Sequence, residues 1–183
     1  MTSILKVSEI QDPTNGTTAA TIDSNGTFVP KLNIIQATKT NTQQITGAHQ
    51  DVLSATITPS STSSKILIQV LFNGACDERY ASVKLYRGST QIALGDANGA
   101  SPRVFMSIDS NNDEPNNQYV MRTLSGNFLD SPSTASAITY KITAGNDHST
   151  SSSDVYVNMT AVAGAGTHLM RGITTIILTE VAG

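Results

Sequence analysis

The stretch from Lys65 to Asn73 reads KILIQVLFN and places apolar residues on both sides of an extended strand. Side chains alternate between the two faces of a strand, so the even-numbered residues of this stretch share one face, opposite Leu67 and Leu71. A half-exposed strand alternates apolar with polar residues, so this pattern predicts a central strand covered on both faces. We expect one face on the domain core and the other against a second sheet or another subunit.

Short strand-like runs separated by turn residues recur about every eight to twelve residues from Leu32 onward, which is typical of an all-β sandwich. The run at 173–181 is a second candidate for a central strand, and Arg87-Gly88-Ser89 predicts a tight hairpin. The expected strands are 33–38, 51–58, 65–73, 81–87, 90–94, 103–108, 118–124, 137–143, 154–160 and 173–181. The expected long loops are 95–102, 109–117, 145–153 and 163–172. The pattern predicts an antiparallel jelly-roll sandwich with a short N-terminal strand and hairpin extension.

The first 32 residues form a separate segment in this interpretation. Strand-like runs at 4–10, 17–23 and 27–29 surround Asn25-Gly26, a dipeptide that favours a two-residue hairpin. The segment holds few large apolar residues: Ile4, Leu5, Val7, Ile10, Ile22, Phe28 and Val29. These are too few for an independent core, so the segment must pack on another surface. We therefore expect two parts, an N-terminal segment at 1–32 and a jelly-roll domain at 33–183.

The charge of the chain argues against several classes of partner. Charged residues make up 14% of the sequence, compared with about 25% in an average soluble domain. The net charge is −3 and the basic residues are scattered, whereas nucleic acid requires a clustered basic surface. No apolar run reaches the roughly 18 residues of a membrane span, and the N-terminus lacks the pattern of a secretory signal. Cys76 is the only cysteine, so no intrachain disulfide can form.

Candidate chemistry is sparse. The three histidines, His49, His148 and His168, have no zinc-ligand spacing, and we interpret each as a surface or loop residue. The run Asp109–Glu114 resembles the start of a calcium loop, but its sixth position is not glycine and its twelfth, Val120, is not glutamate. Nucleophile elbows and phosphate loops are also missing from the sequence. We therefore expect no catalytic residue, no cofactor and no bound metal.

Two sets of stretches resemble proteins of tailed bacteriophages. Residues 4–11 (ILKVSEIQ) and 17–28 (TTAATIDSNGTF) resemble the N-terminal leader of many virion proteins of tailed phages, especially marine ones. A second set resembles a domain of phage fibre and surface proteins, which is similar to the trimeric jelly rolls of the tumour necrosis factor and complement-head type. This set comprises 57–68 (ITPSSTSSKILI), 85–89 (LYRGS), 128–132 (FLDSP), 137–142 (AITYKI) and 173–181 (ITTIILTEV). Together the two resemblances cover nearly the whole chain.

The resemblance implies a non-enzymatic structural protein of the virion, a homotrimer attached through its N-terminal strands to capsid or tail proteins. A capsid decoration or cement protein and a short tail fibre or fibre tip that binds a host surface receptor are the alternatives. The short chain, with no repeat shaft or coiled coil, favours decoration, and the long loops favour receptor binding. A glycan depolymerase would need paired acids and aromatic platforms, and the sequence shows neither pattern.

These expectations select two groups of residues. The expected trimer interface comprises Leu67, Leu71 and Ile177, because they belong to the two strands that are apolar on both faces. The expected virion attachment surface comprises the large apolar residues of the N-terminal segment: Ile4, Leu5, Val7, Ile10, Ile22 and Phe28.

Overall fold

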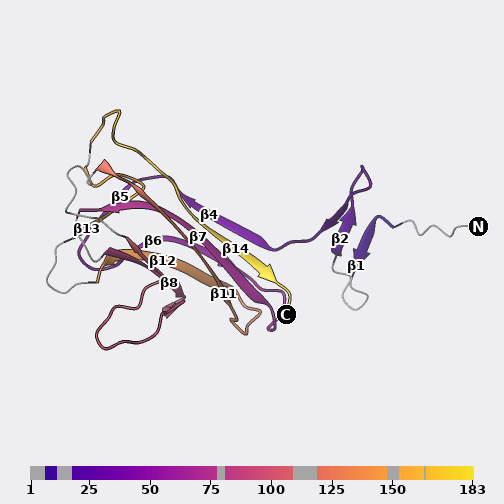
Figure 1. Ribbon diagram of the computed structural model, residues 1–183. Coiled ribbons are helices and arrows are strands. Elements are labelled where there is room, and N and C mark those ends of the chain that lie inside the picture. The colour runs from indigo at the N-terminus through magenta and orange to yellow at the C-terminus, as the bar shows by residue number, and fades with distance from the viewer. Residues whose placement is uncertain (1–6, 12–17, 78–80, 109–118, 148–152, 163) are drawn as a thin grey trace, which may run out of the picture. The chain divides into compact units, whose positions relative to one another are not determined.

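The computed structural model describes residues 7–11, 18–77, 81–108, 119–147, 153–162 and 164–183 (Figure 1). The chain divides into two compact units, a leader unit (residues 1–33) and a sandwich unit (residues 34–183). All the residues of the main hydrophobic core belong to the sandwich unit. The sandwich unit therefore has a core of its own.

The first sheet of the sandwich unit is organised around β7, which pairs with β14 and β13 along one edge and with β11 along the other. Strands β4 and β5 pair in turn with β14 and β13. The strands are β4 (Ile34–Lys39), β5 (Gln43–Thr46), β7 (Lys65–Cys76), β11 (Arg122–Asp130), β13 (Asp154–Val157) and β14 (Thr174–Val181).

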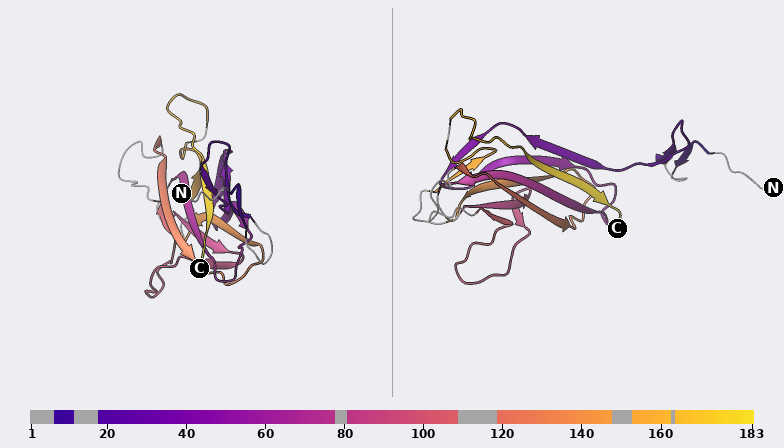
Figure 2. Two further views of the ribbon diagram at one scale, coloured as in Figure 1. Left: turned by 90° about the vertical axis from the view of Figure 1, so that its right-hand side faces the viewer. Right: turned by 45° about the horizontal axis from the view of Figure 1, so that its top comes forward.

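The second sheet has the order β10-β8-β12-β6, with β9 beside β10 on the outer edge of β8. Its strands are β6 (Gln50–Ile57), β8 (Ala81–Arg87), β9 (Thr90–Ile92), β10 (Met106–Ile108) and β12 (Ile138–Asn146). The loop between β9 and β10 projects away from the sheets (Figure 2).

The strand order confirms the predicted jelly-roll class. Eight principal strands follow one another along the chain as β4, β6, β7, β8, β10, β11, β12 and β14. One sheet contains the first, eighth, third and sixth of them, and the other contains the second, seventh, fourth and fifth. All the pairings are antiparallel, and this interleaved order is that of a double-sheet jelly roll.

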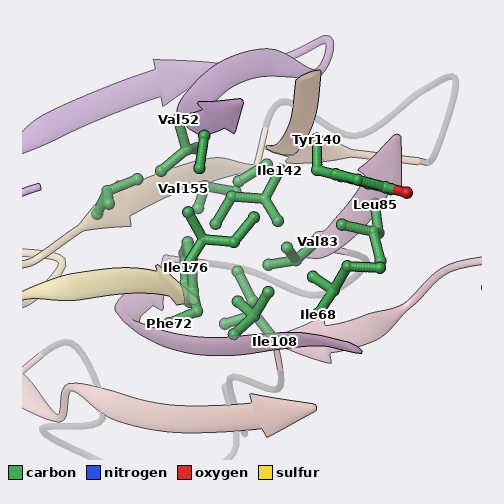
Figure 3. Close-up of a cluster of buried hydrophobic side chains, with 14 of the residues drawn as sticks. Val52, Ile68, Phe72, Val83, Leu85, Ile108, Tyr140, Ile142, Val155 and Ile176 are labelled. Atoms are coloured by element: carbon green, nitrogen blue, oxygen red, sulfur yellow. The ribbon is translucent and has the colours of Figure 1, made fainter. Parts of the chain in front are cut away.

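The core lies between the two sheets and is built by the period of two in each strand. Ile68 and Phe72 of β7 and Ile176 of β14 point from the first sheet toward Val83 and Ile142 of the second (Figure 3). These five side chains have no exposed surface. Burial of each such side chain contributes roughly 1.5–3 kcal/mol, so the sheets are held together mainly by this layer.

A buried polar cluster also joins the two sheets. Asp130, at the end of β11, accepts hydrogen bonds from Arg87 Nη1 at 3.0 and 3.1 Å and from the Tyr140 hydroxyl at 2.6 Å. Tyr140 has no exposed surface, and the Asp130 side chain is only 8% exposed. Burial, and then the hydrogen bond to Asp130, raise the pKa of Tyr140 above its ordinary value, so its hydroxyl remains a donor. The cluster links β11 of one sheet to β8 and β12 of the other.

The strand expected at 118–124 is wrong in its bounds, because β11 continues to Asp130. Leu124, Gly126 and Phe128 alternate with the exposed residues Ser125 and Asn127, which is the period of a half-buried strand. The small residues in the middle of this run weakened its apolar pattern.

Other differences arise where turns interrupt an apolar run. The strand expected at 154–160 ends at Val157, because Asn158 adopts a positive φ of 60° and donates through Nδ2 to the carbonyls of Lys39 and Asn41. The strand expected at 103–108 is shorter, since it begins at Met106. Strand β5 was not predicted, and β12 includes two residues that were expected in a loop. The hairpin predicted at Arg87-Gly88-Ser89 is confirmed by the pairing of Arg87 with Thr90.

The leader unit contains a three-stranded antiparallel sheet in the order β1-β2-β3. Its strands are β1 (Glu9–Gln11), β2 (Thr18–Ile22) and β3 (Phe28–Pro30). The predicted two-residue hairpin is instead a three-residue loop at 24–26, because Asp23 and Thr27 still bond through their backbones. Gly26 has a φ of 79°, and the Asp23 carboxylate accepts from the Asn25 and Thr27 amides at 2.9 and 2.8 Å.

We predict that Asp130→Asn lowers the free energy of unfolding by about 2–4 kcal/mol, because it leaves the partly buried Arg87 guanidinium without a charged partner. Chemical denaturation of the purified protein measures this change. Lys141→Met is the matched control, since Lys141 pairs with an exposed Asp51 and should change stability by less than about 1 kcal/mol. Equal effects of the two substitutions would contradict the importance assigned to the buried cluster.

Candidate functional site

The middle of the outer face of the first sheet is a regular array without charged side chains, although Lys65 of β7 and Asp154 of β13 lie on the same side of the sheet outside this array. The register of β11, β7, β14 and β4 aligns its residues in three rows of four. In order from β11 to β4, the rows are Leu129, Leu67, Thr179 and Ile34; Asn127, Gln69, Ile177 and Gln36; and Ser125, Leu71, Thr175 and Thr38. We call these twelve residues the uncharged face.

The uncharged face mixes exposed apolar side chains with neutral polar ones. Leu129 and Ile34, at opposite edges of the first row, are 46% and 48% exposed, and Leu67, Leu71 and Ile177 are half-buried. A shallow depression of about 420 Å³ lies along the middle of the face, between β11 and β14. An uncharged surface with exposed leucine and isoleucine side chains is more typical of a contact with protein than of a face kept in water.

The outer face of the second sheet differs in its charge. Lys141 Nζ lies 2.8 Å from Asp51 Oδ1 and 5.6 Å from the centre of the Tyr86 ring. Lys84 likewise pairs with Asp147. Charged groups that satisfy one another within a single chain are typical of a face that meets solvent, so the two outer faces of the sandwich have different physical character.

The structure brings the three predicted interface residues onto one surface. Leu67 and Leu71 lie in alternate rows of β7, and Ile177 lies in the row between them on β14. The expectation that this stretch of β7 is covered on both faces is not met within one chain, because the second sheet covers only the even-numbered residues. Leu129 and Ile34 were missed: β11 was predicted to end too early, and Ile34 belongs to an edge strand.

The second sheet carries a half-buried polar cluster around His49. His49 Nδ1 lies 3.0 Å from Thr143 Oγ1, and its Nε2 lies 3.3 Å from both Asp147 Oδ2 and Ser82 Oγ. Ser82 and Lys84 also donate to the two carboxylate oxygens of Asp147. His49 was expected to be a surface or loop residue; it lies in the turn before β6, and its side chain is only 14% exposed, so it is a loop residue but not a surface one.

The His49 cluster does not have the geometry of a nucleophilic relay. A relay needs one imidazole nitrogen on the nucleophile and the other on the carboxylate. Here the same nitrogen, Nε2, faces both Ser82 and Asp147, and the Ser82 hydroxyl donates directly to the carboxylate. The arrangement is a closed polar network that fastens the turn at 47–49 to β8 and to the end of β12.

Burial sets the protonation state of this network. Burial, and then the charge of Lys84, lower the pKa of His49 below its ordinary value, so neutral imidazole is favoured. Burial alone would raise the pKa of Asp147, but hydrogen bonds from Lys84 and Ser82 and the charge of Lys84 outweigh it and lower that pKa. The neutral ring can then donate from Nε2 to Asp147 and accept from Thr143 at Nδ1.

The expected attachment residues are exposed where the structure describes them. Phe28 is 55% exposed, Val7 and Ile10 are each 44% exposed, and Ile22 is half-buried. Ile4 and Leu5 lie outside the described residues. The leader unit therefore presents several apolar side chains that its own sheet does not cover.

Two further expectations concern metals and membranes. His148 and the run Asp109–Glu114 lie outside the described residues, and His168 lies exposed in the loop before β14. Among the residues that the structure places, no three His, Cys, Asp or Glu side chains gather as metal ligands. No helix in the same part of the chain has the length and apolar character that crossing a bilayer requires.

Comparison with known proteins gives distant structural likenesses. No family model matches the chain, and no curated protein matches it. The VP2 subviral particle of infectious bursal disease virus is similar at 12% identity and a TM-score of 0.39, over 96% of this chain and 41% of that one. The structure of the Gx strain of that virus is similar at 14% identity and a TM-score of 0.35, over 98% and 42%. The chain thus spans about two fifths of those proteins, and at these TM-scores the fold assignment rests on the strand pairings.

We predict that stability falls as the pH decreases below the unfolded-state pKa of His49, 6.5. The folded-state pKa is lower, so the unfolded state takes up protons first, and the contribution of neutral His49 is complete above pH 6.5 and lost below it. Urea unfolding at about pH 7.5 and about pH 5.5 measures this loss, and His49→Gln should reduce it.

The control for this experiment is His168→Gln, which makes the same change at an exposed histidine. It should leave the difference between the two pH values unchanged. A wild-type protein with equal stability at both, or an equal effect of the two substitutions, would contradict the role assigned to His49.

Proposed function

We propose that the chain is a non-enzymatic structural protein of a phage virion, a homotrimer attached to the particle through the strands of its leader unit. Capsid decoration, or cementing, is the role that we assign to it. The observation that carries the proposal is the uncharged face, which gives the sandwich one surface suited to contact with other subunits. The sequence resemblance to phage leaders supports the proposed place in a virion, and the resemblance to trimeric jelly-roll domains supports the proposed number of three subunits.

The two outer faces of the sandwich support the choice of interface. Subunit contacts are depleted in charged residues at their centre, and the uncharged face meets that condition over all twelve positions. The other outer face would require Lys141 and Asp51 to lose their water. Association through the first sheet therefore costs less desolvation.

The leader unit supports the mode of attachment. Its sheet has three short strands, and apolar side chains such as Phe28 remain exposed on it. A sheet of this size gains stability by packing against another surface, and its open edges can pair with a strand of a neighbouring protein. Capsid or tail proteins of the particle are the partners that we propose.

A short tail fibre or fibre tip is the second candidate. The loop from Leu94 to Arg103, between β9 and β10, is exposed, and the segment at 164–170 is also largely exposed. Recognition residues are often carried on such loops above a rigid sandwich. Electron cryomicroscopy of the intact particle separates the two roles, because density on the capsid supports decoration and density confined to the tail tip supports the fibre.

We predict that Ile177→Asp converts the trimer to monomer or unfolds the chain, because an unpaired charge buried in an interface costs several kcal/mol, on the order of 3. Light scattering coupled to size exclusion measures the mass. Ser54→Asp introduces the same charge at an exposed position opposite Lys141 on the other outer face, and it should remain trimeric. A wild-type monomer at micromolar concentration, or a trimer unaffected by Ile177→Asp, would exclude the proposed interface.

We predict that deletion of residues 1–30 leaves a folded trimer that no longer joins particles. The sandwich unit keeps its whole core after the deletion, since no residue of the main core lies before β4. Thermal unfolding and light scattering test the fold and the mass, and particles purified after mixing with either form test incorporation. Normal incorporation of the shortened protein would move attachment to the sandwich unit, and a failure to fold would make the leader unit part of its core.

A further inference from the structure

The small sheet of the leader unit has one apolar face. Directly paired residues of antiparallel strands lie on the same face, and so do residues two apart along a strand. The register therefore groups five residues, which we call the apolar leader face: Ile10, Ala20, Ile22, Phe28 and Pro30. The opposite face carries Glu9, Thr21 and Val29, and Val29 is 44% exposed, as Ile10 is. The charge on the described strands of this sheet is thus confined to one side.

Two large side chains of the apolar leader face are exposed, whereas Ala20 between them in the register is only 3% exposed. Phe28 is 55% exposed and Ile10 is 44% exposed, although both lie on paired strands. Isolated small sheets are marginal in water, and the burial of such side chains supplies much of the stability that they need. An occupant for this face is therefore expected.

We infer that the occupant is the same face of other copies of this chain, so that three leader sheets pack together around one axis. The inference rests on the proposed trimer. Around a threefold axis the contacts are heterologous, so each part of a face must suit contact with other parts of the same face on the next copy. The apolar leader face satisfies this condition, whereas the opposite face would bring the Glu9 carboxylates of the copies together.

The link between the two units also supports this occupant. Strand β3 ends at Pro30 and β4 begins at Ile34, so the connection extends over at most about 14 Å. Ile34 itself belongs to the uncharged face, through its pairing with Thr179. Sandwich units that meet through that face therefore hold their leader units on short tethers at a high effective concentration.

This arrangement assigns separate roles to the faces and edges of the leader sheet. The apolar leader face closes the assembly on itself, and no strand among the described residues pairs with the outer edges of β1 and β3. Open strand edges pair readily with strands of other proteins. Attachment to the particle would then use backbone hydrogen bonds at these edges.

Disulfide trapping tests the inference on the full chain. The background is Cys76→Ser, since Cys76 is the only native cysteine. Phe28→Cys places a thiol on the apolar leader face, and Val29→Cys places one on the opposite face of the same strand. Under mild oxidation in the absence of particles, the Phe28→Cys trimer should form covalent dimers on a non-reducing gel, with the third chain left as monomer. The Val29→Cys trimer should stay uncrosslinked.

The outcomes separate this inference from the proposed function. A trimeric mass without crosslinks at position 28 would overturn the packing of leader sheets but not the proposed trimer. Equal crosslinking at positions 28 and 29 would also overturn the packing of leader sheets. A monomeric mass would overturn the trimer itself. If Phe28→Cys does not fold, hydrogen exchange of the β2 backbone amides in the wild-type trimer is measured instead. Packed leader sheets predict slow exchange of these amides. Exchange as fast as in an isolated 1–33 peptide would contradict the packing.

Discussion

Strand β7 pairs with β14 along one edge and with β11 along the other, and its even-numbered side chains from Ile66 to Phe72 are buried against the second sheet. Because side chains alternate, burial of this set places Leu67, Gln69 and Leu71 on the outside. A slip of one residue in the register would exchange the two sets and bring Gln69 into the core. The same constraint that fixes the core thus fixes the composition of the outer surface.

The twelve residues of the uncharged face carry no charge, although Lys65 and Asp154 lie elsewhere on that side of the sheet, and the opposite outer surface carries paired charges. On the second sheet, the pairs of Lys141 with Asp51 and of Lys84 with Asp147 are satisfied within one chain. On the first sheet, leucine and isoleucine side chains lie among threonine, serine and amide groups. Because of this difference, association through the outer face of the first sheet costs less desolvation than association through the outer face of the second. The leader unit shows a similar asymmetry, with Glu9 on one side of its sheet and Phe28 on the other.

The sequence allowed prediction of the features that depend on local pattern. The central strands, the hairpin at Gly88 and the second and third strands of the leader unit follow from alternation and turn residues, and so does the grouping of Leu67 with Leu71. The first leader strand, expected at 4–10, is wrong in its bounds, because β1 begins at Glu9. Strand β11 was misplaced because Ser125, Gly126 and Asn127 interrupt its apolar run. The cluster of His49 with Ser82 and Asp147 could not be predicted, because its members are far apart in the sequence and meet only through the pairing of β8 with β12 and the turn before β6.

Hydroxyl-radical footprinting of the intact protein tests most directly whether the uncharged face is buried between copies of the chain. The comparison is between Leu71 and Ile177 on that face, Ile68 in the core and Leu94, which is 40% exposed in the loop after β9. Burial between subunits predicts that Leu71 and Ile177 are oxidised as slowly as Ile68 at concentrations where the protein assembles, and faster on dilution. Oxidation of both at the rate of Leu94, independent of concentration, would contradict the account.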